Sequence, residues 1–401
     1  MQTLTLDNGL KVIFHKRATS SVAVEVTVKT GSNDEEEGKQ DISHFLEHMV
    51  FEGTKKRKTN KEIANEIEKI GGELNAYTSN EKTCFFVKVL KKHFETALDV
   101  ISDVVINPLF EEQAIRRERD VILKEIGMVK DEPRFHQWIL FQKALYERFP
   151  AKNPTYGTVK DVRSIRRDDL LSYHRKNYAP GNMIVSVVGD INDPFPLIEK
   201  YFGSMKKMPG IRVKRAIELK QKKKKRVEKR KIQNSYVVLG YKAVTRREKD
   251  SYVLDVVKAI LGRGQSGKLF IEIRNKRGLV YEIGVNNESN INYGYFAVYL
   301  NTDKKNIPLI TKLILEEFKK LKDITETELK ETKDYLEGEY ILHNEDNFHL
   351  ADELNFWGMA GDANMINTYV SQIKKVTKKD INRVVDRYLT DDYCLAVIEQ
   401  S

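Results

Sequence analysis

The sequence predicts an α+β fold of two related domains, each a mostly antiparallel sheet packed by helices. Two observations support this prediction. Strand-like alternation and helical periodicity are interspersed along all 401 residues, a length expected for two or three domains. In addition, a helix-then-strand unit at 168–178 and 183–189 recurs at 376–388 and 393–398, 210 to 211 positions later. A repeat of this length indicates two related domains rather than a solenoid.

The domains are expected to meet near Pro209 and Gly210, where a basic run follows. We therefore predict an N-terminal domain, a basic linker and a C-terminal repeat domain over 1–212, 213–232 and 233–401. The basic run contains Lys222–Arg226 and Lys229–Lys231, which could bind nucleic acid or an anionic membrane. Aromatic residues are not interleaved with it, so a solvated linker or a strand edge is the favoured interpretation.

Net charge, apolar runs and cysteine content indicate which partners and which compartment to expect. The 69 Lys and Arg against 59 Asp and Glu give a net charge of +10, which permits an anionic partner without demanding one. Because the basic run lacks interleaved aromatic residues and lies between two domains, we expect neither nucleic acid nor a membrane as a partner. No stretch approaches the length of about 18 apolar residues that spans a bilayer. The chain starts on a hairpin-like pattern without a signal peptide, and Cys84 and Cys394 read as reduced core residues, so we expect a cytoplasmic protein.

The elements of the first half follow from periodicity and turn residues. An Asp7–Gly9 turn divides the first apolar pattern into a hairpin. Two glycines, Gly71 and Gly72, end a helix and release a strand. Strands are expected over 3–14, 21–30, 73–79 and 83–89, and helices over 59–70 and 92–105.

The stretch 41–54 (DISHFLEHMVFEGT) carries the clearest chemistry. His44 and His48 are four apart, so on a helix both imidazoles can reach one metal ion. Glu47 lies on the same face, where its carboxylate can reach a water on that metal. The other positions are apolar and would hold the helix against a core. A histidine pair alone is more often surface or satisfied core, but this HxxEH order inverts the familiar HExxH zinc signature and marks the inverzincins.

A helix expected over 111–130 supplies the missing ligand. Its inward face by spacing comprises Glu118, Val121, Ile122, Glu125, Ile126 and Val129. Two carboxylates on a face made for burial need a cation or strong donors. Either they pair with arginines such as Arg116 or Arg119, or one of them completes a zinc site with the two histidines. Taken with the histidine pair, zinc is the favoured interpretation.

The second half is expected to hold a strand over 235–241 and a helix over 251–261. The glycine-rich stretch 262–269 matches GxGxxG, but Leu269 stands where a P-loop needs Ser or Thr, and a helix rather than a strand precedes it. A nucleotide-binding function is therefore a minor alternative. Further expected elements are a helix over 269–278, which leads into the stretch 279–285, and helices over 308–322 and 326–345.

The stretch HFLEH at 44–48, with Glu125 following 77 positions after His48, resembles the pitrilysin and mitochondrial processing peptidase family of zinc metallopeptidases. The flanking stretches 31–32 (GS), 51–54 (FEGT) and 118–126 (ERDVILKEI) agree with it. The resemblance covers nearly the whole chain and implies two related α+β domains in the half-clamshell arrangement of a processing peptidase.

The resemblance also implies residue roles. His44, His48 and Glu125 would bind one Zn²⁺ per chain, Glu47 would be the general base, and Glu118 would be a second catalytic carboxylate. One departure is Asp41, where the family usually has Gly. We expect Asp41 to cap the helix that follows it.

Substrate residues are implied in the same way. Arg274 and Tyr281 match a pair that points at the bound substrate and would stabilise the oxyanion or the peptide backbone. Asn75 and Ala76 lie where an extended peptide pairs with a sheet edge.

Short members of the family pair two chains, so a homodimer is expected, with Arg274 and Tyr281 completing the partner's zinc site; a heterodimer with a related subunit is the alternative. The implied function is zinc-dependent hydrolysis of unfolded or short peptides, bound in extended form inside a dimeric chamber. The competing interpretation is a non-catalytic or partner-requiring subunit of a heteromeric processing peptidase.

Overall fold

The structure is a computed structural model that describes residues 1–211, 218 and 220–401. Its contacts divide the chain into two compact units that exchange segments. Unit 1 comprises Met1–Met128, Pro154–Lys214 and Leu342–Ile366. Unit 2 comprises Val129–Asn153, Arg215–Ile341 and Asn367–Ser401.

Unit 1 is built on a mostly antiparallel sheet. Its described strands are β1 (Gln2–Thr5), β2 (Lys11–Lys16), β3 (Ser21–Val28), β4 (Glu73–Thr78), β5 (Thr83–Leu90) and β6 (Met183–Gly189). They lie in the order β1-β2-β6-β3-β5-β4, and β2 and β6 are the parallel pair among these neighbours. Strand β4 is therefore at an edge of the sheet.

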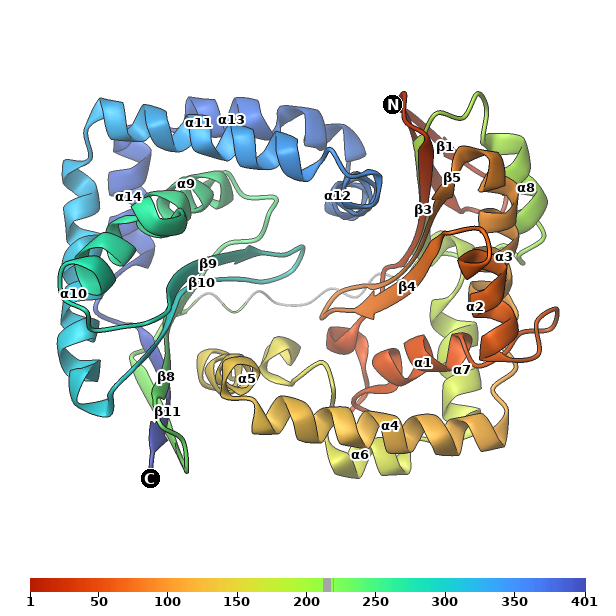
Figure 1. The fold of residues 1–401 in the computed structure, drawn as a ribbon. Helices are drawn as coiled ribbons and strands as arrows, with labels where there is room; N and C mark the ends of the chain where they lie inside the picture. Colours follow the sequence, from red (N-terminus) through yellow and green to blue (C-terminus); the bar gives the residue numbers. More distant parts are fainter. Residues whose placement is uncertain (212–217, 219) are drawn as a thin grey trace. The chain divides into compact units, whose positions relative to one another are not determined.

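Alternation along β3 explains how this sheet is covered. Val22, Val24, Val26 and Val28 enter the main core of unit 1 together with α1 and α3. The intervening residues, which include Glu25 and Thr27, face the other side, yet they are fully buried. Helix α12 covers them, so both faces of the sheet are occupied (Figure 1).

The helices of unit 1 surround this sheet. They are α1 (Ile42–Val50), α2 (Asn60–Glu68), α3 (Phe94–Ile106), α6 (Val159–Ser164), α7 (Arg167–Asn177), α8 (Phe195–Phe202) and α12 (Asn347–Ala360). Helix α4 (Glu112–Asp131) begins in unit 1 and ends in unit 2. Helix α12 comes from the second half of the sequence, whereas the others come from the first half.

Unit 2 repeats the topology of unit 1. Its described strands are β7 (Lys224–Arg230), β8 (Ser235–Lys242), β9 (Ile283–Ser289), β10 (Gly294–Thr302) and β11 (Cys394–Gln400). The order β7-β11-β8-β10-β9 matches β2-β6-β3-β5-β4 strand for strand, and the first pair is parallel in both sheets. The predicted fold class, two related domains with mostly antiparallel sheets packed by helices, is thereby confirmed.

The helices of unit 2 include one segment from the first half, α5, which packs on β8 and β11. They are α5 (Pro133–Leu145), α9 (Asp250–Gly262), α10 (Ile307–Lys320), α13 (Tyr369–Lys375) and α14 (Lys378–Tyr388). Helix α11 (Glu326–His343) begins in unit 2 and ends in unit 1. The expected helix over 269–278 forms a π-helix at Phe270–Asn275.

The predicted boundaries 1–212, 213–232 and 233–401 divide the chain between its two repeats. In the structure, α5 from the first half of the chain belongs to unit 2, and α12 from the second half belongs to unit 1. Part of the predicted linker, 212–217 and 219, lies outside the described residues. Its basic run forms β7, an edge strand with mostly exposed side chains, which was one of the two favoured interpretations. Cys84 and Cys394 are free and buried, as predicted. Among the described helices, none has the length and apolarity needed to cross a bilayer.

Candidate metal centre

Helix α1 presents two histidines one turn apart. Phe45, Leu46 and Met49 are fully buried in the core of unit 1, so they fix the rotation of the helix. This rotation places His44 and His48 together on the opposite side, with their Nε2 atoms 3.2 Å apart. The buried apolar frame thus determines where the imidazoles point.

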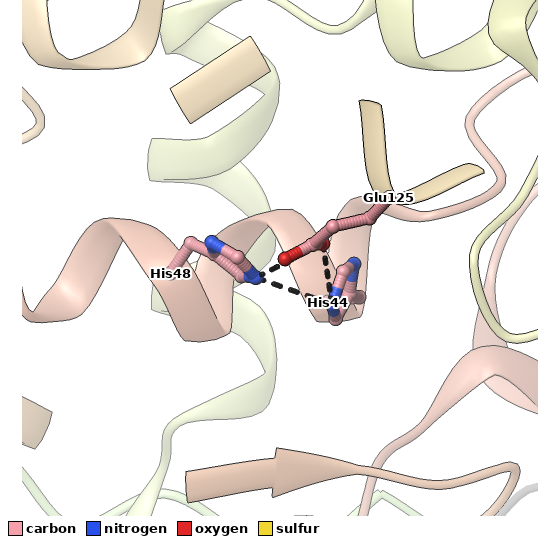
Figure 2. A group of neighbouring side chains, drawn as sticks. All are labelled: His44, His48 and Glu125. Atoms are coloured by element: carbon pink, nitrogen blue, oxygen red, sulfur yellow. Dashed lines mark hydrogen bonds and ion pairs between the residues drawn. The ribbon is translucent and has the colours of Figure 1, made fainter. Parts of the chain in front are cut away.

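Helix α4 brings a carboxylate to the same point. Glu125 Oε2 lies 3.7 Å from His44 Nε2 and 3.6 Å from His48 Nε2 (Figure 2). A tetrahedral zinc ion with bonds of about 2.0–2.1 Å has ligands separated by roughly 3.3–3.4 Å. Glu125 Oε2 is also buried and has no hydrogen-bond partner among the described residues. Spacing, donor types and the unpartnered oxygen therefore fit a zinc ion held by His44, His48 and Glu125.

The far nitrogens of both imidazoles contact carboxylates. His48 Nδ1 lies 3.0 Å from Glu118 Oε2, and His44 Nδ1 lies 3.1 Å from Asp41 Oδ1. Arg119, the alternative partner for these glutamates, donates instead to the carbonyl oxygens of Val162 and Ile165. The ion-pair alternative is thus not supported for Glu118. Carboxylates that accept from Nδ1–H leave the Nε2 lone pairs for a metal.

Two sequence-based expectations near the site were wrong. Asp41 does precede α1, but its side chain makes no capping hydrogen bond, because its backbone is left-handed with φ 83°. Glu35 caps the helix instead, accepting the backbone N–H groups of Asp41 at 2.8 Å and Ser43 at 3.0 Å. The helical spacing also predicts Val121 on the inward face of α4, but in the structure its side chain is exposed.

Electrostatics keeps His44 neutral. Its burial and the neighbouring His48 lower the pKa of His44 to about 4. Burial acts on His48 in the same direction, but hydrogen bonding to Glu118 and the charge of Glu125 outweigh it and raise the pKa of His48. A neutral imidazole is the form that binds a metal.

Glu47 lies beside the ligands on the same helix face. Its Oε2 accepts a hydrogen bond of 2.6 Å from Thr78 Oγ1 on β4. Burial raises the pKa of Glu47, although the Thr78 hydrogen bond opposes that shift. Thr78 was not singled out from the sequence, and nor was Tyr156, whose ring lies edge-on to His44 with centroids 4.9 Å apart. Nothing in their local patterns distinguishes them from ordinary strand and loop residues.

A cleft of about 580 Å³ adjoins the centre. It is lined from α1, α2, β4 and α4 by Glu47, His48, Phe51, Glu52, Asn60, Ile63, Ala64, Ile67, Glu68, Gly72, Glu73, Leu74, Asn75 and Glu118. Two predicted substrate residues, Asn75 and Ala76, lie on the edge strand β4, and Asn75 also lines the cleft. The Ala76 N–H donates to Asn75 Oδ1 at 2.8 Å, as expected for an amide facing the open edge.

Arg274 and Tyr281 belong to unit 2, whereas His44, His48 and Glu125 belong to unit 1. The Arg274 guanidinium lies 5.2 Å from the centroid of the Tyr281 ring and 4.6 Å from that of Phe270. The Tyr281 side chain is 74% exposed. The two side chains are thus neighbours, and their role toward a substrate stays a prediction.

A second cluster meets the geometric requirement for a metal but already contains a cation. Glu25, Cys84 and Asp352 offer ligand atoms that all lie within 4.8 Å of one another. The Lys82 ammonium donates to Asp352 Oδ1. Burial lowers the pKa of Lys82, but the acidic neighbours Cys84 and Asp352 outweigh it and raise that pKa. Lys82 therefore supplies the positive charge that this cluster needs.

The glycine-rich stretch shows no phosphate-binding arrangement. It follows helix α9 rather than a strand, and Lys268 forms an ion pair of 2.7 Å with Glu328. The minor nucleotide-binding alternative gains no support from this geometry.

Comparison with known proteins agrees with the two-unit fold. The family model described as insulinase (peptidase family M16) matches residues 11–159, and the peptidase M16 inactive domain matches residues 164–336. A protease from Helicobacter pylori superposes with a TM-score of 0.93 at 27% identity, covering 99% of each chain. A Pseudomonas fluorescens structure described as a peptidase M16 inactive domain gives a TM-score of 0.91 at 21% identity, covering 100% of this chain and 98% of that one, which shows the shared fold.

Sequence relatives are named as zinc proteases. The uncharacterized zinc protease YmxG of Bacillus subtilis is 31% identical over 99% of this chain and 98% of the relative. The uncharacterized zinc protease ML0855 of Mycobacterium leprae is 32% identical over 98% of this chain and 90% of the relative. The family predicted from the HFLEH stretch and Glu125 is confirmed: the chain belongs to peptidase family M16, the insulinase or pitrilysin family.

Proposed function

We propose that the protein is a zinc-dependent endopeptidase with an inverted HxxEH motif. The convergence of His44 Nε2, His48 Nε2 and Glu125 Oε2 at 3.2–3.7 Å carries this proposal. Two imidazoles and one carboxylate form a ligand set typical of catalytic zinc, with a position left for water. When bound there, one zinc ion per chain would lower the pKa of a water molecule and polarise the scissile carbonyl.

Glu47 acts as general base and then as general acid. Burial raises its pKa above that of an ordinary carboxyl group, which makes Glu47 a stronger base than an exposed carboxylate. It takes a proton from the attacking water and delivers it to the amine nitrogen as the peptide C–N bond breaks. Thr78 holds Oε2 of the carboxylate in place during both transfers. Glu118 acts in catalysis by holding the His48 ring.

The substrate is an unfolded or short peptide bound in extended form. The open edge of β4 supports this, because the Ala76 amide bonds to a neighbouring side chain and can pair with an added strand instead. Asn75 lies beside the cleft that leads to Glu47 and His48. Backbone pairing of this kind reads few side chains, so sequence preference is expected to be loose.

A homodimer completes each site in this proposal, with Arg274 and Tyr281 of one protomer contacting the substrate at the other protomer's zinc. The exposure of Tyr281 and its contact with Arg274 support a pair available to a ligand. Such a dimer would enclose the peptide in a chamber. A heterodimer with a related subunit is the alternative assembly.

The direct test is cleavage of a pool of unstructured peptides by zinc-loaded wild type and Glu47→Gln, with products identified by mass spectrometry. The Gln side chain keeps the shape and cannot take the proton, so activity should fall by about 10²–10⁴-fold. Zinc content of the variant serves as the control and should equal that of wild type. Equal cleavage by both proteins would refute the role of Glu47. If neither cuts while both bind zinc, the chain is a subunit that needs a partner.

A further inference from the structure

Asp41 has an unusual backbone conformation directly before the metal-binding helix. Its φ is 83°, and among the described non-glycine residues Phe110 alone shares a positive φ. A Cβ atom disfavours this left-handed region, which glycine tolerates freely. A strained residue persists only where its surroundings hold it, and such residues gather at functional sites.

The surroundings are built around the Asp41 side chain. Asp41 is fully buried, and Glu35 accepts its backbone N–H at 2.8 Å. Gly157 lies against it: a Cβ added to Gly157 would come within 2.6 Å of Asp41 Cβ. The loop thus has room for the aspartate only because glycine stands opposite.

The side chain contacts a metal-binding residue rather than the end of its helix. Asp41 makes no capping hydrogen bond, and its Oδ1 lies 3.1 Å from His44 Nδ1. A carboxylate that accepts Nδ1–H selects the tautomer whose Nε2 lone pair is free, and it fixes the plane of the ring. Glu118 makes the equivalent contact with His48.

We infer that Asp41 is a positioning residue that orients His44 and strengthens its binding of zinc, and that this contact compensates for its left-handed conformation. The inference rests on the zinc site proposed above and adds a role for a residue outside its ligand set. Glycine would adopt this backbone conformation more easily than aspartate, but it has no carboxylate to contact His44. The Asp41 carboxylate contacts Nδ1 of His44 and not the Nε2 atom that lies beside Glu125, so it acts through the His44 imidazole.

The test compares wild type with Asp41→Gly and Asp41→Asn. Zinc affinity is measured by competition with a chromophoric chelator, and the ligand geometry by the visible spectrum of the cobalt-substituted proteins. Loss of a carboxylate that supports a ligating histidine weakens metal binding about 10–100-fold. Asp41→Gly should show this loss and an altered cobalt spectrum. Asp41→Asn should lie in between, because its amide oxygen still accepts the Nδ1–H.

Thermal unfolding of the metal-free proteins separates positioning from folding. Because glycine favours φ 83°, the melting temperature of metal-free Asp41→Gly should equal or exceed that of wild type while its zinc affinity falls. Glu36→Gln, which removes an exposed carboxylate from the same loop, is the matched control and should bind zinc as wild type does.

Two results would overturn the inference: Asp41→Gly binding zinc within threefold of wild type, or losing affinity only together with its melting temperature. If wild type itself binds no zinc, the proposed function fails as well, and that outcome is distinct from the other two.

Discussion

Each imidazole of the candidate metal centre has its Nε2 atom beside Glu125 and its Nδ1 atom beside a second carboxylate. The spacing of Glu118 and Glu125 on one helix predicts two carboxylates at this place. In the structure Glu118 lies 3.0 Å from His48 Nδ1 and Glu125 lies 3.7 Å from His44 Nε2. The spacing could not predict which histidine nitrogen each carboxylate contacts. Glu118 and Glu125 are two turns apart on the same face of α4, so their contacts depend on where α1 crosses α4, and spacing does not reveal that crossing point. Glu118 meets Nδ1 and Glu125 meets Nε2.

Asp41 shows why residue roles are harder to predict than residue types. Aspartate before a helix is a common capping residue, and the sequence alone predicted that role. The cap geometry requires an extended backbone, however, and here a left-handed turn points the carboxylate at His44. Backbone conformation at one position thus decided the function of a side chain.

Glu25 makes stability depend on pH. Burial and the charge of Asp352 raise the pKa of Glu25 to about 8 from an ordinary 4.5. The unfolded chain therefore loses this proton at a lower pH than the folded protein. The stabilisation is complete below pH 4.5 and is lost as pH rises through about 8, at up to about 1.4 kcal/mol per pH unit. The free energy of unfolding of the metal-free protein should decrease over this range.

Glu25→Gln should make that decrease shallower without abolishing it, because burial also raises the pKa of Glu35 to about 8. Thr27 and Asn355 both donate to Glu25 Oε1, and the Gln oxygen can accept both hydrogen bonds. Urea unfolding of the metal-free protein at several values between pH 5 and 8 measures the slope. The exposed Glu36→Gln is the control and should keep the wild-type slope. A Glu25→Gln slope equal to that of wild type would show that Glu25 titrates normally.

At the scale of elements, local patterns predicted strands and helices well. The strand expected over 21–30 is β3 at Ser21–Val28, and the helix expected over 111–130 is α4 at Glu112–Asp131. What covers each face was not predictable. The alternation in β3 suggests a solvent-exposed face at Glu25 and Thr27, but α12, more than 300 residues later in the chain, buries it.

The edge strand β4 allows a specific test of how substrate binds. Ala76→Pro removes the amide that faces the open edge, and proline is tolerated on edge strands. One lost hydrogen bond is worth about 1 kcal/mol, so the KM for a peptide should rise roughly fivefold. Ala76→Val, which keeps the N–H, should behave as wild type.

Zinc content of the proline variant should not change, because the substitution lies outside the ligand set. An unchanged KM for Ala76→Pro would mean that the peptide does not pair with β4 at this position.

At the scale of the whole molecule, the repeat was visible in sequence and the shared strand order confirms it. The exchange of α5 and α12 between the units was not visible. Periodicity reports that a helix has an apolar face, but not which sheet covers that face. Both sheets offer the same topology, so only long-range packing distinguishes them.

Assembly is tested by mixing Glu47→Gln protein with Arg274→Ala protein under conditions that allow subunit exchange. If Arg274 completes the partner's site, each mixed dimer has one intact site. Random exchange should then restore about a quarter of wild-type activity. Exchange is verified with differently tagged chains. Demonstrated exchange without recovered activity would exclude completion by the partner, and a mixture of each variant with itself is the baseline.

The interleaving of the units also bears on synthesis at the ribosome. Unit 1 takes its last segment, Leu342–Ile366, after most of unit 2 has been made, so neither unit is complete until nearly the whole chain has emerged. Until α12 is made, the sheet face that carries Glu25 and Thr27 has no cover. The same face carries Phe86 opposite Glu25 and Ile184 opposite Thr27, and the Phe86 ring stacks on Phe348 of α12 in the finished fold. The nascent chain therefore holds an uncovered face of mixed polar and apolar side chains until α12 has been made.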